Sequence, residues 1–171
     1  CPHYLVLTPA DVEAAGPVAK CAPPVRADPG LRERLGDLQL IASDHSPSSP
    51  ELKAGAFGDA WGGIAGAQTT RTLLADLGAR ELARLTAAGA AERFGIAGKG
   101  RIAVGADADL ALMELGGEHV LRAEDLRYRH KLSPYIGRPL SARVVRTLLR
   151  GAEVYPEPRG RPRLLTPETT C

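Results

Sequence analysis

The stretch Leu38–Pro47, LQLIASDHSP, decides the fold that we expect for this chain. Its first five residues are nearly all apolar, which is typical of a parallel strand covered on both faces. An aspartate, Asp44, and a histidine, His45, then follow together. Because active sites of α/β barrels lie at the carboxyl ends of strands, the pattern predicts a strand over residues 38–43 that presents Asp44 to a reaction site. The alternative is that Asp44 caps a turn, since Asp-x-Ser-Pro is common in turns.

The length and composition of the chain fit one globular domain or one and a half. The chain has 171 residues, of which 44% are hydrophobic, so it can bury a core. Its 19 glycines and 14 prolines predict many turns. The formal net charge is +2 and the charges are scattered, which gives no indication of a nucleic-acid or membrane partner. No apolar run approaches the roughly 20 residues of a membrane-spanning helix, and no signal peptide is visible.

Cysteine usage favours a reducing compartment, and we expect the protein to be cytoplasmic. The three cysteines, Cys1, Cys21 and Cys171, are odd in number and lack CxxC spacing, so a disulfide framework is not expected. The chain begins with Cys1, and its single methionine is Met113. Because a primary translation product starts with methionine, we expect the chain to be a piece of a longer protein.

Residues 1–95 are expected to alternate short helices with extended segments. CPHYLVL at the start is an apolar run suited to a strand. In TPADVEAAG, Thr8 is placed to cap a helix that ends at Gly16. In DPGLRERLG, Asp28 is placed to cap a second helix that ends at Gly36. AQTTRTLLADLG and ARELARLTAAGAAERFG also have helical spacing, the second with an apolar face formed by Leu82, Leu85, Ala88 and Phe94.

Beyond Gly95 the pattern changes to that of short β-strands. We expect RIAV, ADLALMEL and ARVVRTLLRGAEVY to pair in one small sheet, with a tight turn at GADAD and a further short strand in HVLRAEDL. GRPRLLTPETTC at the end has the composition of a tail. The expected fold is therefore α/β over about residues 1–95, followed by a mostly β part over about residues 99–155.

Few residues apart from Asp44 carry a chemical signal. A carboxylate at the end of a strand can hold a metal ion and take a proton from water that the metal activates. The sequence has no HxH, HExxH or paired Cys/His spacing, so His3, His45 and His130 do not define a zinc site by spacing. The glycines of WGGIAG, residues 61–66, follow no predicted strand. We interpret them as points where the backbone approaches a ligand or another strand closely.

Six segments occur in an order and at separations that resemble one protein family. They span Cys1 to about Tyr155 and are CPHYL, KCAPPVR, IASDHSP, AWGGIAGAQ, GRIAVGADADLAL and RHKLSPYIGRPLSARVVRTLLRG. Together they resemble the C-terminal half of allantoinases, which belong with dihydroorotases and hydantoinases to the cyclic amidohydrolases. SDHSP or GADAD alone is typical of the wider amidohydrolase superfamily, whereas KCAPPVR, AWGGIAG and HKLSPYIGR favour allantoinase.

The resemblance implies a distorted (β/α)8 barrel, similar to a TIM barrel, with a small β-sandwich domain. Residues 1–98 would form the C-terminal part of the barrel and residues 99–155 would supply sandwich strands, with an insertion around 122–138 that returns to the barrel. Residues 156–171 would be a tail. A barrel of this type needs about 250 residues, so this chain would hold roughly its last three strands. Its partner would be the missing N-terminal half, in an enzyme that forms a homo-oligomer, a tetramer.

The resemblance also implies a reaction, the hydrolysis of the ring amide of allantoin to allantoate. Two divalent metal ions, zinc by analogy, are bound in the family by an HxH pair, a carboxylated lysine, two further histidines and one aspartate. Asp44 matches that aspartate, which is a metal ligand and the catalytic group that moves a proton to the leaving nitrogen. Cys21, Gly62 and Gly63 would face the substrate, largely through backbone groups, and His45 would contact it.

Some positions depart from the family pattern, and alternatives stay open. The other metal ligands of the family lie upstream of the matching region, so this chain alone is expected to be inactive. His3 stands where relatives can carry glutamine, and we interpret it as structural or as a support for the metal ligands. Gly89 replaces an asparagine typical of the family. The alternative functions are dihydropyrimidinase, hydantoinase or dihydroorotase and, in a different class, a non-catalytic scaffold that lacks the metals.

Overall fold

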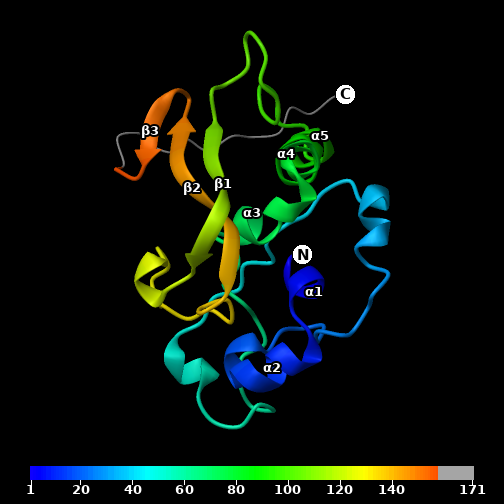
Figure 1. Cartoon of the computed structure of the whole chain (residues 1–171), viewed down its shortest axis with the longest axis vertical. Helices are drawn as coiled ribbons and strands as arrows, with labels where there is room; N and C mark the ends of the chain where they lie inside the picture. The colour runs from blue at the N-terminus through cyan, green and yellow to red at the C-terminus, as the bar shows by residue number, and fades with distance from the viewer. Residues whose placement is uncertain (158–171) are drawn as a thin grey trace.

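The computed structural model describes residues 1–157, which form short helices joined by long loops and a three-stranded sheet (Figure 1). The α-helices are α1 (His3–Val6), α2 (Pro9–Ala15), α3 (Thr70–Leu73), α4 (Ala79–Ala83) and α5 (Gly89–Arg93). The 3₁₀ or π turns are η1 (Gly16–Ala19), η2 (Glu33–Asp37), η3 (Pro50–Lys53), η4 (Ala75–Leu77), η5 (Arg84–Ala88) and η6 (Ala123–Asp125). The strands are β1 (Leu110–Val120), β2 (Pro139–Leu149) and β3 (Ala152–Tyr155). The architecture is therefore of the α/β kind, with the predicted tail after residue 157 outside the described residues.

Helix α1 stands where we predicted a strand, whereas helix α2 confirms a prediction. The segment CPHYLVL, which we expected to be a strand, forms α1, and only Leu7 at its end is extended. An apolar run does not distinguish a strand from a buried helical turn, and here backbone hydrogen bonds to the carbonyl of Pro2 close the turn. Helix α2 begins after Thr8 and ends at Gly16 as predicted, and Asp11 completes a reciprocal capping box with Thr8.

The predicted helix after Asp28 forms only as a turn and a 3₁₀ segment. The Asp28 carboxylate accepts a hydrogen bond from the amide of Gly30 at 3.1 Å, as a capping residue does. The chain then winds into η2, which runs through Gly36 to Asp37 instead of ending before it. Asp28 therefore makes the local hydrogen bond of a turn, but it caps no helix, because η2 begins after Arg32 and has no side-chain cap.

Residues 38–43, the predicted strand, are not a strand in the described structure. The one β-contact of this stretch is an isolated parallel bridge between His45 and Ile64. A parallel strand needs amide and carbonyl partners on strands beside it. The amide of Ile41 instead donates to the carbonyl of Leu85 at 2.8 Å, so the apolar run packs against the helices as an extended loop.

The helices after residue 69 confirm part of the predicted apolar face. Leu82 and Leu85 lie in a buried cluster that also contains Leu35, Ile41 and Leu74. Ala88 and Phe94, which were predicted on the same face, are exposed. The π turn η5 explains the difference, because its wider turn shifts the phase of the residues that follow. Gly89 takes the buried position instead.

The β part forms one antiparallel sheet in the order β1-β2-β3. The predicted strands ADLALMEL and ARVVRTLLRGAEVY are confirmed, and Glu114 pairs with Arg143 across β1 and β2. The prediction for RIAV is wrong, because it lies in the loop before β1 with Ile102 and Val104 90% and 108% exposed. HVLRAEDL is divided between the end of β1 and η6. The loop at 101–104 finds no pairing partner within the described residues, which leaves its apolar side chains in solvent.

The sheet packs onto the helical part through one face of β2 and the loop that precedes it. Along β2, Leu140 and Ala142 are buried and alternate with exposed residues, as expected of a strand with one covered face. A single buried cluster joins the two parts of the chain and contains Leu7, Cys21, Ile64, Leu73, Leu121, Leu126, Tyr135 and Leu140. The segments before and after residue 99 therefore share a core.

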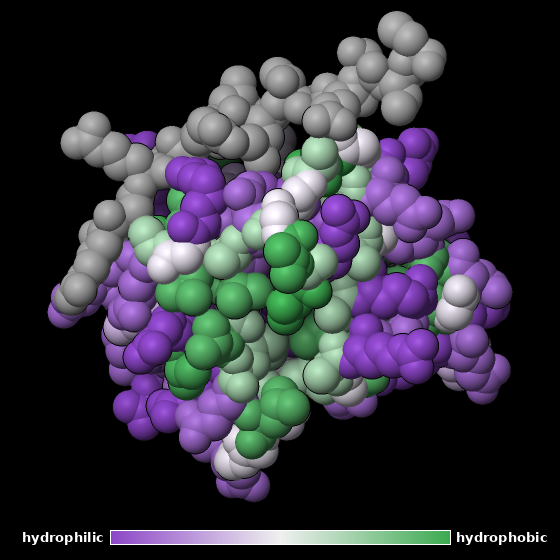
Figure 2. Space-filling model, turned by 90° about the horizontal axis from the view of Figure 1, so that it is seen from above, coloured by the Kyte–Doolittle hydropathy of each residue, from purple (hydrophilic) through white to green (hydrophobic). Residues whose placement is uncertain are grey.

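Apolar side chains also remain on the surface. Leu112, Leu115 and Val120 of the outer strand β1 are 40%, 58% and 45% exposed. Apolar groups gather on the face that Figure 2 shows from above, the end of the molecule that carries the loop between α5 and β1. Within residues 1–157, no helix combines the length and the apolar character needed to cross a membrane.

Candidate functional site

Asp44 lies on an exposed loop, three residues after the buried Ile41. Its backbone has a φ of 46°, in the left-handed region that few residues other than glycine, asparagine and aspartate adopt. His45 then forms the parallel bridge to Ile64, and the amide of Ser46 donates to the Ile64 carbonyl at 3.0 Å. Asp44 therefore does not end a regular strand, but the left-handed turn holds it where the 41–47 loop meets the 61–66 loop.

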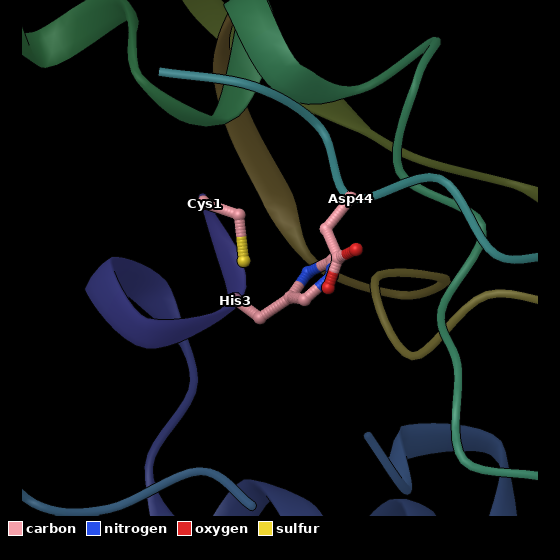
Figure 3. A group of neighbouring side chains, drawn as sticks. All are labelled: Cys1, His3 and Asp44. Atoms are coloured by element: carbon pink, nitrogen blue, oxygen red, sulfur yellow. The ribbon is translucent and has the colours of Figure 1, made fainter. Parts of the chain in front are cut away.

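Asp44 faces the beginning of the chain, where two further ligand-type side chains approach it (Figure 3). The Sγ of Cys1, a ring nitrogen of His3 and a carboxylate oxygen of Asp44 all lie within 4.8 Å of one another. Cys1 is half-buried, His3 is completely buried and Asp44 is exposed. These residues come from α1 and its preceding residues and from the 41–47 loop, so two distant segments build one polar cluster.

The His3 ring is held on one side only. Its Nδ1 lies 2.7 Å from the hydroxyl of Tyr135, which is itself completely buried. Among residues 1–157, its Nε2 has no hydrogen-bond partner although it is buried. Burial lowers the pKa of His3, an effect that the charge of Asp44 partly offsets. The ring therefore favours the neutral form, with one nitrogen directed at the Asp44 side of the cluster.

The chemistry of the cluster fits a divalent ion. Thiolate, imidazole nitrogen and carboxylate oxygen are the ligand types that zinc takes in proteins. Ligands around one zinc ion lie about 3.3–3.8 Å apart, so groups already within 4.8 Å need only small rotations to share an ion. The exposed Asp44 carboxylate is the group that the structure leaves available to an ion, whereas the unpartnered nitrogen of His3 is buried behind it.

His45 has a defined ring orientation. Its Nδ1 accepts hydrogen bonds from the backbone amides of Gly66 and Ala67 at 3.1 and 3.3 Å. Its ring also packs against Tyr128 with the ring centroids 5.2 Å apart. Because Nδ1 acts as an acceptor, Nε2 carries the proton in the neutral ring. His45 is exposed, so this N–H is available to donate to a ligand.

Cys21 does not offer its thiol to a ligand. The side chain is 6% exposed and lies in the shared core with Ile64 and Tyr135. The Sγ donates to the carbonyl of Pro23 at 3.4 Å, and burial raises the pKa of the thiol. The thiol is therefore not accessible to a ligand, and the predicted backbone contact with a substrate stays a prediction.

The two glycines of the predicted substrate loop have different surroundings. A Cβ on Gly63 would lie 2.5–2.7 Å from atoms of Ser46, so no side chain fits there. A Cβ on Gly62 would lie 3.7 Å from the Cβ of Ala22, an ordinary contact. Gly63 therefore permits the backbone to approach the loop after Asp44, as we expected of these glycines, and Gly62 borders the Cys21 loop.

Lys53 ties these loops together, and its role was not predicted from the sequence. Its Nζ donates to three backbone carbonyls, those of Pro17, Lys20 and Trp61, at 3.0, 3.1 and 2.8 Å. The residue is 9% exposed, and burial lowers the pKa of its ammonium group. The Cys21 loop and the Trp61–Gly63 loop are thus fixed to one point.

The roles of Tyr135 and Gly66 were also missed, because both depend on distant residues. Tyr135 reaches His3 across 132 positions of sequence. A Cβ on Gly66 would lie 2.8 Å from the carbonyl oxygen of Ser43 and 3.3 Å from the ring of His3. No spacing rule signals such contacts. A cavity of about 750 Å³ lies between the sheet and residues 67–72, and its lining does not include Asp44.

Comparison with known sequences places these residues in a family context. No family model matches the chain. It is 49% identical over 168 residues to an allantoinase from Rubrobacter xylanophilus, covering 91% of this chain and 37% of that protein. It is 45% identical over 174 residues to an allantoinase from Bacillus licheniformis, covering 94% of this chain and 38% of that protein. The chain thus spans little more than a third of the length of the curated relatives it matches.

Solved structures with a similar fold come from a neighbouring group. One is the L-hydantoinase (dihydropyrimidinase) from Arthrobacter aurescens, with a TM-score of 0.80 and 29% identity over 92% of this chain and 39% of that one. Another is the dihydropyrimidinase from Brevibacillus agri, with a TM-score of 0.81 and 28% identity over 90% of this chain and 38% of that one. Identity to the allantoinases is clearly higher and extends over nearly the whole chain. By sequence, therefore, the chain is similar over nearly all of its length to allantoinases, and it matches little more than a third of theirs.

Proposed function

We propose that this chain forms part of a metal-dependent cyclic amidohydrolase that opens the ring amide of allantoin to give allantoate. The observation that carries the proposal is the position of Asp44, exposed at the meeting point of the loops that also present His45 and Gly63. Its support is the 44–49% identity to proteins named allantoinase. The solved neighbours support a barrel of the hydantoinase kind, to which residues 1–98 would contribute the C-terminal part.

The metal ions belong to this proposal. Two divalent ions, zinc by our proposal, would supply a water molecule of lowered pKa to attack the ring carbonyl. Asp44 would be one ligand, and the remaining ligands would come from outside the described residues. The Asp44 carboxylate would take the proton from the attacking water and release it to the ring nitrogen that leaves, as a general base and then a general acid.

The other residues of the site would bind and orient the ring. The free N–H of His45 points away from its two backbone donors and would donate to a ring carbonyl. The backbones at Cys21, Gly62 and Gly63 would face the ring, held in place by Lys53. Cys21 would act through its backbone, because its thiol is buried and keeps its proton.

The proposed assembly is a cytoplasmic homo-oligomer, a tetramer, whose subunits include the N-terminal half of the barrel. The exposed apolar side chains of β1 would be covered by strands from that half, which would complete the sandwich. By itself, the chain of 171 residues should bind metal weakly and hydrolyse allantoin negligibly, because one carboxylate and its neighbours leave most of two coordination spheres to water.

Allantoin hydrolysis by the full gene product, measured with and without zinc, tests the proposal. We expect metal-dependent ring opening of allantoin, and a loss of at least about 100-fold in kcat for Asp44→Asn, the low end for removal of a general base. Asparagine keeps the size of the side chain but cannot accept the proton. Near-normal turnover of Asp44→Asn with full metal content would show that Asp44 has a different role.

A second candidate function is hydrolysis of dihydropyrimidines or hydantoins, which the solved neighbours favour. Hydantoin, dihydrouracil and dihydroorotate should be assayed beside allantoin, and the ratio of kcat/KM values decides between these substrates. A full gene product that folds, binds no metal and opens none of these rings would instead support the non-catalytic scaffold.

A further inference from the structure

One polar atom in the core lacks an explanation. His3 is completely buried, yet its Nε2 has no hydrogen-bond partner among residues 1–157. Buried polar atoms are nearly always paired, because an unpaired one loses its bond to water without a replacement. The only other buried side-chain atom without a partner in the described chain is the Oγ of Ser48. The exception at His3 points toward the carboxylate of Asp44 (Figure 3).

The partner of the other ring nitrogen decides which nitrogen carries the proton. Tyr135 is completely buried, and burial raises the pKa of its hydroxyl well above the usual range, so it keeps its proton. A hydroxyl that donates to Nδ1 across 2.7 Å leaves the ring proton on Nε2. In the opposite tautomer, Nδ1 would donate to the Tyr135 hydroxyl. The hydroxyl proton of Tyr135 and the lone pair on Nε2 would then both lack a partner. The first arrangement leaves one unpaired group, an N–H beside a carboxylate.

The ring is also fixed sterically in this place. A Cβ at Gly66 would come within 3.3 Å of the His3 ring and within 2.8 Å of the carbonyl oxygen of Ser43. The absence of a side chain at Gly66 therefore creates the space in which the ring lies against the backbone next to Asp44. Asp44 itself is exposed and turned by its left-handed backbone, so its side chain can rotate over the short distance to Nε2.

We propose that His3 is a positioning residue for Asp44: its Nε2–H donates a hydrogen bond to one carboxylate oxygen, and Tyr135 fixes the ring in the tautomer that can do so. The bond orients the carboxylate and leaves its second oxygen for a metal ion and the transferred proton. The inference rests on the proposed function, which gives Asp44 its chemical role. It adds that a residue distant in sequence sets the orientation of that carboxylate.

The first test measures the tautomer directly. ¹⁵N chemical shifts of the His3 imidazole in the full gene product should show a protonated Nε2 and an unprotonated Nδ1. Tyr135→Phe removes the hydroxyl that fixes this state and should give a mixture of tautomers. A spectrum in which Nδ1 carries the proton in the unmodified protein overturns the proposal. This readout does not depend on turnover, so it stands apart from the test of the proposed function.

The second test compares two substitutions of His3. Glutamine retains an N–H donor, whereas leucine has a similar volume and none. His3→Leu should lower kcat by about 10–100-fold, the usual cost of losing a partner that orients a metal ligand, with little change in KM. His3→Gln should recover most of that loss. Equal losses in both variants would overturn the proposal, since a purely structural role does not distinguish a donor from an apolar group of the same size.

Metal titration and a control histidine complete the design. With zinc alone as the probe, His3→Leu should weaken binding but keep the stoichiometry. Loss of one zinc per subunit would mean that His3 ligates the metal itself, which overturns the positioning role. His119 lies on β1 with 39% of its side chain exposed, 3.7 Å from Asp125, and His119→Gln should leave turnover and zinc affinity unchanged. If Asp44→Asn keeps its turnover while the ¹⁵N result holds, the chemical role proposed for Asp44 is wrong and the hydrogen bond from His3 is retained.

Discussion

The backbone amides and carbonyls in the two parts of this chain find their hydrogen-bond partners in different ways. After residue 109, three strands form a ladder in which each strand finds its neighbour within about 40 residues of sequence. Before residue 96, the helices have at most seven residues, and the stretch at 38–43 forms no strand. The first part is instead held by close backbone contacts at glycines and by side chains that reach carbonyls of distant loops. Asp44, His45, Cys21, Gly62 and Gly63 all lie in the first part, and the second part contributes Tyr135, which contacts His3.

The difference shows that function here depends on the less regular region. Antiparallel strands carry their own hydrogen-bond partners, so the sheet tolerates changes in single side chains. The loops around Asp44 and His45 keep their geometry only through particular contacts, such as those at Gly63 and Lys53. Substitutions should therefore cost more stability in the first part than in the sheet. The following predictions are ordered by the expected loss of stability.

The largest effect on stability is expected at Gly89. A Cβ there would lie 1.9 Å from the carbonyl oxygen of Gln39, so Gly89→Ala forces the α5 backbone away from the 38–41 segment. We expect the free energy of unfolding of the full gene product to fall by about 3 kcal/mol, the upper end for overpacking. Urea unfolding measures this. Gly36→Ala is the matched control, because no atom lies within 4 Å of its Cβ and the variant should be neutral or slightly more stable.

The next largest effect should follow from Lys53→Met. The change removes an ammonium group that donates to three carbonyls and leaves them without that donor. We expect a loss of about 2 kcal/mol in stability and a higher KM for the ring substrate, because the two loops lose their common anchor. Lys20→Met is the control, since Lys20 donates to one exposed carbonyl, that of Gly58, at 2.6 Å. Equal effects of both changes would contradict the anchor role.

A smaller loss is expected from Thr8→Ala at the start of α2. The variant removes the side chain that accepts from the amide of Asp11 at 3.2 Å and should cost about 1 kcal/mol. Hydrogen bonds from the Thr8 side chain and backbone hold the pKa of Asp11 below 3.8. The stabilisation is therefore present above pH 3.8 and is lost as the pH falls through the lower folded-state pKa. Urea unfolding at pH 7 and pH 2.5 should show the difference between the two proteins shrinking in acid.

The smallest effect should come from Lys99→Met, next to the sheet. Lys99 pairs with Asp107 at 2.7 Å and with Asp109, on the loop before β1. Ion pairs near the surface contribute little, so we expect a loss below about 1 kcal/mol that disappears in about 1 M salt. Thermal unfolding at low and high salt measures it. A loss as large as that of Gly89→Ala would remove the contrast between the two parts.

The sequence predicted elements whose signals are local. The cap and stop of α2 depend on Thr8 and Gly16, which act on their own turn. Strand β1 follows from its apolar residues and β2 from its β-branched ones, and the buried positions of Leu82 and Leu85 follow from helical spacing. The family resemblance, confirmed by comparison with the allantoinases, drew attention to Asp44 where spacing alone left a capped turn open.

The failed strand predictions share one cause, which is dependence on a partner strand elsewhere in the sequence. CPHYLVL and 38–43 have the composition of strands, but a strand exists only beside another one, and the described chain offers the second segment only the bridge from His45 to Ile64. RIAV remains unpaired for the same reason. The exposure of Phe94 was mispredicted because a π turn upstream shifted the helical phase.

The sequence by itself determined the resemblance to allantoinases, the bounds of α2 and the strands of the small sheet, because these signals lie in neighbouring residues. Only the tertiary structure decided that His3 approaches Asp44 and Tyr135, that Lys53 joins two loops, and that Gly66 makes room for an imidazole ring. These contacts connect residues up to 132 positions apart. Their geometry depends on how the whole core closes, since a buried polar atom finds its partner only once the segments around it are packed.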